Sequence, residues 1–378
     1  MHGEITKEKG KSFMDKRDYS LDLVRIFAVV MVVSNHFFLL NGFYYEIVQG
    51  KRMYALNLMR TFSLTCVPLF LVLTGYLMCQ KTLSRTYYRG ICKTICIYLL
   101  ASVSCIIYAN IVSPGTYEIK NAILDILGFK AADYSWYIEM YIGLFLLIPF
   151  LNLIYQNLRD KRQKQCLIVT LLILTALPGI TNIYNFYMDG WWKTPSLSTD
   201  YQKIIPAYWI SIFPLTYYFI GCYLRENEVK LKRKWNLVWL LCCILVFGSF
   251  CFYRYYNGKI VEVAGEYQDW GAVLNVVQTV LLFVLLTGIK GVNRLPSGIK
   301  RIIKYLSDLT LGAYLVSSIF DSVFYPKLNE AVKEVPHKLE YYFVIVPAVL
   351  VCSFLLSAVI NFIYRILGMI VAKAKAAV

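Results

Sequence analysis

The chain has 378 residues, of which 58% are hydrophobic and only 16% charged, and this composition excludes an ordinary soluble domain. Its formal net charge of +16 would suggest a nucleic-acid partner in a soluble protein. Here the basic residues gather in alternate loops between apolar stretches, which is typical of membrane topology, so we expect no nucleic-acid binding. The eleven cysteines lie in or beside apolar stretches without a ligand or disulfide pattern, so we expect no metal site.

Ten apolar stretches follow one another along the chain, each close to the ~20 residues that a helix needs to cross the hydrocarbon core. We therefore predict an all-α fold, a polytopic transmembrane helix bundle of about ten spans. The fifth stretch is short and has a weak boundary at Pro178-Gly179. The predicted spans are 20–41, 61–80, 91–112, 136–157, 166–183, 204–224, 235–254, 270–289, 306–325 and 341–364.

Lysine and arginine indicate the direction of these spans. Segments on one side of the membrane hold 26 of them, whereas the loops on the other side hold 12. Because cytoplasmic segments are enriched in these residues, we expect both termini in the cytoplasm. The predicted parts are a cytoplasmic tail 1–19, a ten-span membrane domain 20–364 and a short cytoplasmic tail 365–378. The first span is typical of a retained signal anchor, since no small-residue cleavage pattern follows it.

Asp22, Arg25 and His36 stand out in the apolar first span. Arg25 and His36 are eleven positions apart, which places them on nearly the same helix face, about 16 Å apart along the axis. Ionisable groups at bilayer depth are costly and usually face a cavity, so the pattern predicts a site. His36 is the only histidine within a predicted span, which makes it the natural general base. The alternatives are a histidine that only joins helices and an Asp22–Arg25 bridge that only fixes the start of the span.

Three more acidic residues fall in or near predicted spans. Glu139 precedes the uncharged run 140–158, where it is either part of a site or an interfacial residue. Asp308 is expected to cap the ninth span. Asp321 is expected to reach water at the outer end of that span.

The second span and the basic stretch after it contain further signals. Pro68 frees a backbone carbonyl, and Thr74-Gly75 allows another helix to approach closely. Arg85 and Arg89 are four residues apart on one helix face, where the pair could clamp the phosphates of a nucleotide-like carrier. The alternative is that these arginines only belong to the excess of positive charge that cytoplasmic segments carry.

The order and spacing of these motifs resemble the membrane-bound acyltransferase family 3, whose members transfer acetyl or other acyl groups to surface glycans and related acceptors. The resemblance covers nearly the whole chain. Five motifs carry it: Asp22, Arg25 and His36, then Val67 to Tyr76, Arg85 to Lys93, Ser135 to Pro149, and Ser307 to Leu315. Where the family often has a second histidine after the last motif, this chain has Ser317. The role of that second histidine therefore cannot be assigned to Ser317. Many members carry an appended esterase-like domain, and we expect a stand-alone form here.

The resemblance implies an acyl-CoA donor, most often acetyl-CoA, in the cytoplasm, and a glycan or lipid-linked sugar as acceptor. Arg85, Arg89 and Lys93 would hold the CoA phosphates. The expected location is a cell membrane, the bacterial plasma membrane, among its lipids. The competing class is a transporter or flippase for a lipid-linked sugar or small solute, against which stands the lack of an inverted repeat.

The same resemblance implies roles for the residues of the first and fourth spans. His36 would act as general base on an acceptor hydroxyl or would itself carry the acyl group. Arg25, paired with Asp22, would hold the donor or stabilise developing charge. Glu139 would orient His36 or bind a sugar hydroxyl.

Overall fold

The computed structural model describes residues 17–376 except 199, 228, 230, 257–259 and 261–268. Most of the predicted tail 1–19 and the last two residues of the tail 365–378 lie outside the described residues. The described part is helical and contains no named strand. Its helices are α1 (Tyr19–Leu40), α2 (Gly50–Ser63), α3 (Cys66–Met78), α4 (Arg85–Arg89), α5 (Ile91–Val112), α6 (Ile119–Leu127), α7 (Trp136–Asn157), α8 (Lys161–Thr175), α9 (Pro178–Thr181), α10 (Phe213–Glu226), α11 (Arg233–Tyr255), α12 (Val273–Thr287), α13 (Ser297–Ala331) and α14 (Tyr342–Ala376).

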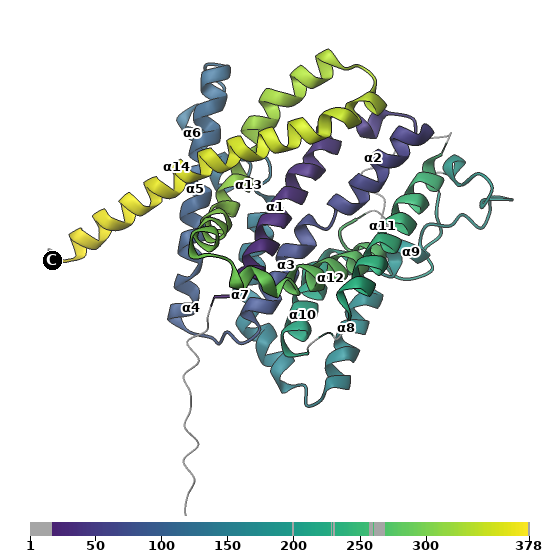
Figure 1. Ribbon diagram of the computed structural model, residues 1–378, viewed down its shortest axis with the longest axis horizontal. Helices are drawn as coiled ribbons and strands as arrows, with labels where there is room; N and C mark the ends of the chain where they lie inside the picture. The colour runs from purple at the N-terminus through teal and green to yellow at the C-terminus, as the bar shows by residue number, and fades with distance from the viewer. Residues whose placement is uncertain are drawn as a thin grey trace, which may run out of the picture.

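Helix α1 lies in the middle of the bundle and packs against α2, α3, α12, α13 and α14 (Figure 1). It also joins the two buried apolar clusters found in the described residues. Val32 belongs to one cluster and Phe37 to the other, so His36 lies where they meet.

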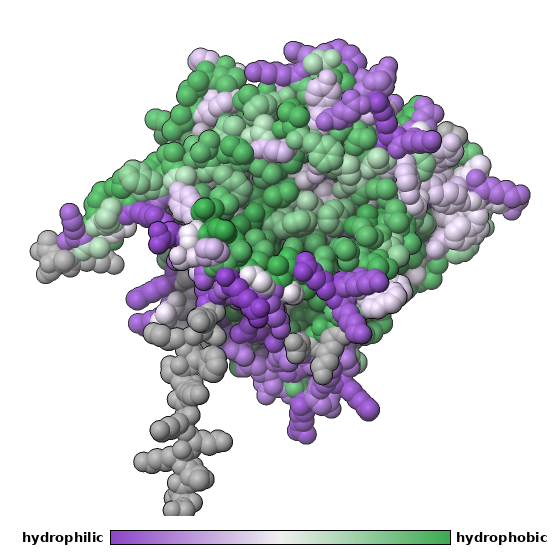
Figure 2. Space-filling view, viewed as in Figure 1, coloured by the Kyte–Doolittle hydropathy of each residue, from purple (hydrophilic) through white to green (hydrophobic). Residues whose placement is uncertain are grey.

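Seven helical stretches of the described chain are long and apolar enough to cross a membrane, and each coincides with a predicted span. The space-filling view shows the matching apolar band, with hydrophilic residues at both ends (Figure 2). The other three predicted spans fall on α8 and α10, which have only 15 and 14 residues, and on the more polar α13. The protein is therefore an all-helical, multi-pass membrane protein, while the total of ten spans and the direction of the termini stay predictions.

Helix α13 differs from its predicted limits at both ends. It begins at Ser297, nine residues before the predicted start, and continues to Ala331. The first turns of α13 contain basic residues. A prediction from hydropathy therefore places the start of the helix too late. Asp308 consequently lies inside the helix and does not cap it, and its Oδ1 is 3.7 Å from Arg17 Nη2. Helix α14 likewise continues to Ala376, so most of the predicted tail 365–378 is helical.

The second predicted span, 61–80, contains α3 and only the end of α2, with a turn at 64–65 between them. Helix α2 begins at Gly50, eleven residues before the predicted start, in a segment expected to be a loop. Pro68 has no N–H and leaves the carbonyl of Leu64 free, as predicted. Asn275 Nδ2 of α12 donates to this carbonyl at 3.1 Å. A buried amide thus replaces the missing helix hydrogen bond and holds α12 against the break.

Helices α3 and α10 approach each other closely through Gly75 and Gly221. A Cβ added at Gly75 would overlap the carbonyl of Tyr218, and one added at Gly221 would overlap the carbonyl of Val72. The close approach predicted at Thr74-Gly75 is therefore confirmed. It holds α3 in place as one wall of the cavity described below.

Replacement of Gly75 by alanine should lower the stability of the protein by about 1–3 kcal/mol, because α3 and α10 must separate. The thermal midpoint of purified protein in detergent measures this change. Gly143→Ala on α7 is the matched control, since nothing lies within 4 Å of its added Cβ. Equal midpoints for Gly75→Ala and the wild type would contradict the prediction.

Candidate active site

His36 is only 5% exposed and lies between α13 and the loop that precedes α7. Its imidazole stacks on the ring of Tyr134, with ring centroids 3.7 Å apart. Its Nδ1 lies 3.1 Å from Oδ2 of Asp321 on α13. The Tyr134 hydroxyl donates to the same carboxylate oxygen at 2.8 Å. These three residues, called the His36 cluster below, bring a carboxylate and a phenol to a buried histidine.

The Nδ1–Oδ2 contact between His36 and Asp321 has the distance of an ion pair but is not aligned as a hydrogen bond. Catalytic hydrogen bonds are often misaligned without substrate and tighten when it binds. The other ring nitrogen, Nε2, has no hydrogen-bond partner within the described part of the chain. A carboxylate on Nδ1 and a free Nε2 are the arrangement of a histidine that acts as a base.

The prediction that Asp321 reaches water is wrong, because this side chain is only 2% exposed. Helix α13 extends ten residues beyond it, so Asp321 lies inside the bundle. Ser317, one turn earlier, donates within its own helix to the carbonyl of Tyr314 at 2.9 Å. The carboxylate that faces His36 thus comes four residues after the position where a second histidine was expected, on the same face of α13.

Glu139 does not occupy the place beside His36. Its side chain is exposed on the first turn of α7 and forms no hydrogen bond or ion pair among the described residues. Tyr137 and Tyr141 of the same helix line a cavity. Glu139 is two positions, about 200°, from either tyrosine and therefore points to another side. Asp321 takes the orienting position that was expected for Glu139.

Asp133 lies next to Tyr134 in the loop before α7. Desolvation raises the pKa of its carboxyl, and the negative charge of Asp321 raises this pKa further, whereas His36 lowers it. Asp133 precedes Tyr134 in the chain, and its own side chain is exposed.

Asp22 and Arg25 pair as expected, with Oδ1 and Nη1 2.9 Å apart. Asp22 is only 1% exposed, and it also binds Arg17 Nε at 2.8 Å and accepts from Ser307 Oγ at 2.8 Å. Its oxygens are thus occupied by three partners from the N-terminal segment, α1 and α13. These contacts hold the Asp22 carboxylate against the Arg25 guanidinium.

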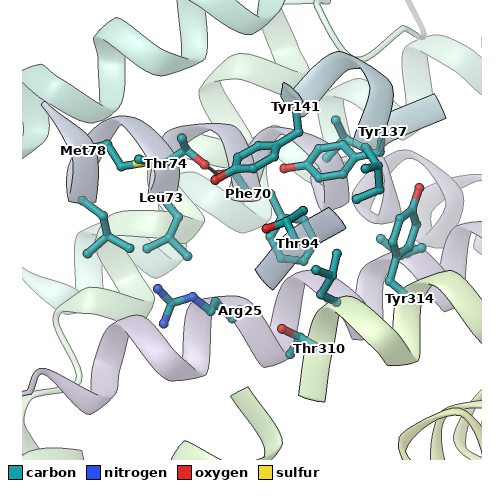
Figure 3. Close-up of a pocket in the computed structure, with 15 residues that line it drawn as sticks. Arg25, Phe70, Leu73, Thr74, Met78, Thr94, Tyr137, Tyr141, Thr310 and Tyr314 are labelled. Atoms are coloured by element: carbon teal, nitrogen blue, oxygen red, sulfur yellow. Dashed lines mark hydrogen bonds between the residues drawn. The ribbon is translucent and has the colours of Figure 1, made fainter. Parts of the chain in front are cut away.

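A cavity of about 270 Å³, the Arg25 cavity, lies between α1, α3, α5, α7 and α13 (Figure 3). Arg25 and Met78 lie toward one end, and Tyr137 and Tyr314 lie toward the other. Most of the lining is apolar, with hydroxyls from threonine and tyrosine side chains.

Tyr314 connects the Arg25 cavity to the His36 cluster. Its hydroxyl donates to the backbone carbonyl of Tyr134, whose ring stacks on His36. Val32, which also lines the cavity, is one helical turn before His36 on α1. None of the three residues of the His36 cluster lines the cavity, which ends at Val32 and Tyr314 beside them.

A second cavity of about 470 Å³, the Lys81 cavity, shares Met78 and Tyr141 with the first. It lies at the loop between α3 and α4, where Lys81 and Tyr87 line it. The Tyr87 ring stacks on Phe145, with centroids 4.4 Å apart. Through these shared residues the two cavities adjoin, and together they extend from the basic loop to Val32 and Tyr314, which lie beside the His36 cluster.

The other basic residues expected to bind the donor lie beside this path. Arg85 and Arg89 are exposed on α4, and Lys93 is exposed on the first turn of α5. Ser84, Tyr87 and Gly90 of the same segment line the Lys81 cavity, so the exposed cations flank its lining. No group of three or more potential metal ligands occurs in the part of the chain that the structure describes.

A row of aromatic side chains on α7 links the two cavities and is absent from the predicted site. Tyr137, Tyr141 and Phe145 follow at four-residue spacing on one face of the helix. Neighbouring ring centroids in this row are 6.3 and 6.2 Å apart. The signal was present in the fourth span as aromatic residues at positions i, i+4 and i+8.

Fold and site together define a multi-pass membrane protein with a buried histidine–carboxylate pair at the end of a largely apolar cavity. The model of the acyltransferase domain family Acyl_transf_3 matches residues 18–362. The chain therefore belongs to acyltransferase family 3, and it is an enzyme, an acyltransferase. Comparison with curated proteins found no match, and comparison with solved structures found none either.

Replacement of Asp321 by asparagine should lower kcat for acyl transfer by about 10²- to 10⁴-fold, because His36 loses the carboxylate that orients it and stabilises its protonated form. The KM for the acyl donor should change little. Initial rates in isolated membranes, normalised to protein amount, measure both constants. Glu139→Gln is the comparison variant and should stay within about twofold of the wild type. A loss of activity in Glu139→Gln but not in Asp321→Asn would indicate that Glu139, and not Asp321, orients His36.

Proposed function

We propose that this acyltransferase moves an acyl group, most often acetyl, from cytoplasmic acyl-CoA to a hydroxyl of an extracytoplasmic or lipid-linked glycan. The observation that supports this proposal is the pair of adjoining cavities that extends from the basic loop to the side chains next to the buried His36 cluster. The acceptor class comes from the family resemblance, as does the location in a bacterial plasma membrane. Label passing from radiolabelled acetyl-CoA to glycan in isolated membranes tests the proposal, and its absence would overturn it.

The donor would bind with its phosphates at the basic loop and its pantetheine arm in the cavities. Arg85, Arg89 and Lys93 would hold the phosphates, together with Lys81 of the Lys81 cavity. Arg25 is about 16 Å along α1 from His36. Of its two expected roles, contact with the donor therefore fits better than charge stabilisation at the reacting carbonyl.

His36 would act through Nε2 at the end of the path. It would take the proton of the acceptor hydroxyl while that oxygen attacks the thioester carbonyl and the CoA thiolate leaves. Asp321 would stabilise the imidazolium, and the proton would then pass to the thiolate. In the second route, Nε2 of His36 attacks the thioester carbonyl, and the CoA thiolate leaves. The acceptor hydroxyl then attacks the acyl group and displaces His36, and the hydroxyl proton passes to the thiolate.

Replacement of His36 by alanine should abolish acyl transfer while the protein still inserts and folds, since the proposed base is lost. Transfer of label in isolated membranes measures activity, and the thermal midpoint in detergent measures folding. His337→Ala is the matched control, because His337 is exposed and faces Glu334 at 3.3 Å, outside both cavities. Wild-type turnover in His36→Ala would exclude a catalytic role.

The double replacement Arg85→Ala with Arg89→Ala should raise the apparent KM for acyl-CoA roughly tenfold, as loss of charge-assisted phosphate contacts predicts. The kcat should be less affected. Arg159→Ala with Arg162→Ala removes two exposed cations from another segment assigned to the cytoplasm and serves as the control. An unchanged KM in the Arg85→Ala, Arg89→Ala variant would show that these arginines do not bind the donor and only belong to the positive charge of the cytoplasmic side.

A further inference from the structure

The Arg25 cavity is elongated and runs along the helices that line it. On α1 its lining runs from Arg25 to Val32, seven residues or about 10 Å further along the helix. On α3, which runs the opposite way, Met78 adjoins the Lys81 cavity and Val67 lies at the far end. The end near Val32 and Val67 is the deep end of the cavity, next to the His36 cluster.

Five tightly packed side chains form the deep end: Val32, Val67, Tyr137, Ile138 and Tyr314. All five are buried, and Ile138 is fully enclosed. The rings of Tyr137 and Tyr314 meet edge to face, with centroids 5.9 Å apart. Close-packed interiors do not expand without strain, so these side chains limit the size of any group that enters.

The deep end is also uncharged. The only charged side chain in the cavity lining is Arg25, at the opposite end (Figure 3). A carboxylate brought to the deep end would lose its hydration without finding a cation, which is costly. The carboxylate of Asp321, next along the path, would repel it as well.

We infer that Val32 and Ile138 select short, uncharged acyl groups, such as acetyl and propionyl, against longer or carboxylated ones. The inference rests on the proposed function, because it requires acyl-CoA in this cavity. With the phosphates at the basic loop, the acyl group is the part of the donor that meets the deep end. Val32 lies one turn before His36, between cavity and imidazole, and Ile138 closes the wall beside Tyr137.

The test compares kcat/KM for acetyl-CoA, butyryl-CoA and succinyl-CoA in the wild type and in Val32→Ala and Ile138→Ala. Each variant should raise the butyryl-to-acetyl ratio at least tenfold, since one methylene in an apolar pocket changes discrimination by roughly 10- to 200-fold. Succinyl-CoA should stay a poor donor in every variant, because no cation is introduced.

Matched controls come from the same two helices. Val33→Ala and Ile148→Ala remove the same groups from fully buried positions that line neither cavity. Both should keep the wild-type butyryl-to-acetyl ratio. Ile138→Val makes a smaller change that disturbs folding less, and it should shift the ratio in the same direction.

The outcomes separate this inference from the proposed function. No transfer from any acyl-CoA by the wild type would overturn the proposed function itself. Equal wild-type turnover of acetyl-CoA and butyryl-CoA, or of acetyl-CoA and succinyl-CoA, would overturn the selectivity alone. Acetyl transfer with an unchanged ratio in Val32→Ala, Ile138→Ala and Ile138→Val would overturn the assignment to these residues.

Discussion

The buried carboxylate of Asp321 sets the constraint on which the site depends. A charged group inside a membrane bundle requires polar partners, because lipid and apolar side chains supply none. The Tyr134 hydroxyl donates to Oδ2 of this carboxylate and the His36 imidazole lies against the same oxygen, whereas Oδ1 has no hydrogen-bond partner among the described residues. These two side chains come from the loop before α7 and from α1. One charge therefore holds three parts of the chain together around the histidine.

A second buried carboxylate acts in the same way at the other end of α1. Asp22 joins α1 to Ser307 of α13, as His36 joins α1 to Asp321. In each helix the two contact residues are 14 positions apart, about 21 Å of helix. Helices α1 and α13 therefore run in the same direction and in register. The Arg25 cavity lies along the stretch between these contacts, so the contacts that join the helices also limit the cavity.

Predictions that depended on near neighbours along one helix agree with the structure. The carbonyl freed by Pro68, the close approach at Gly75 and the Asp22–Arg25 pair follow from local spacing, which the fold leaves unchanged. The predictions for Asp308 and Asp321 failed because both depended on where α13 begins and ends. Hydropathy does not locate the ends of α13, because its first turns are basic and its last turns lie beyond the apolar stretch of the sequence.

The helical membrane class follows from the apolar stretches of the chain, and the resemblance to acyltransferase family 3 follows from the order of its motifs. Helical periodicity places Arg25 and His36 on one face of α1. Which carboxylate faces His36, and which side chains lie between it and the Arg25 cavity, depends on tertiary packing. Asp321 is 285 positions from His36, and its depth and direction follow from the packing of α13 against α1. That packing satisfies buried charges contributed by distant segments, and no local pattern in the chain encodes their pairing.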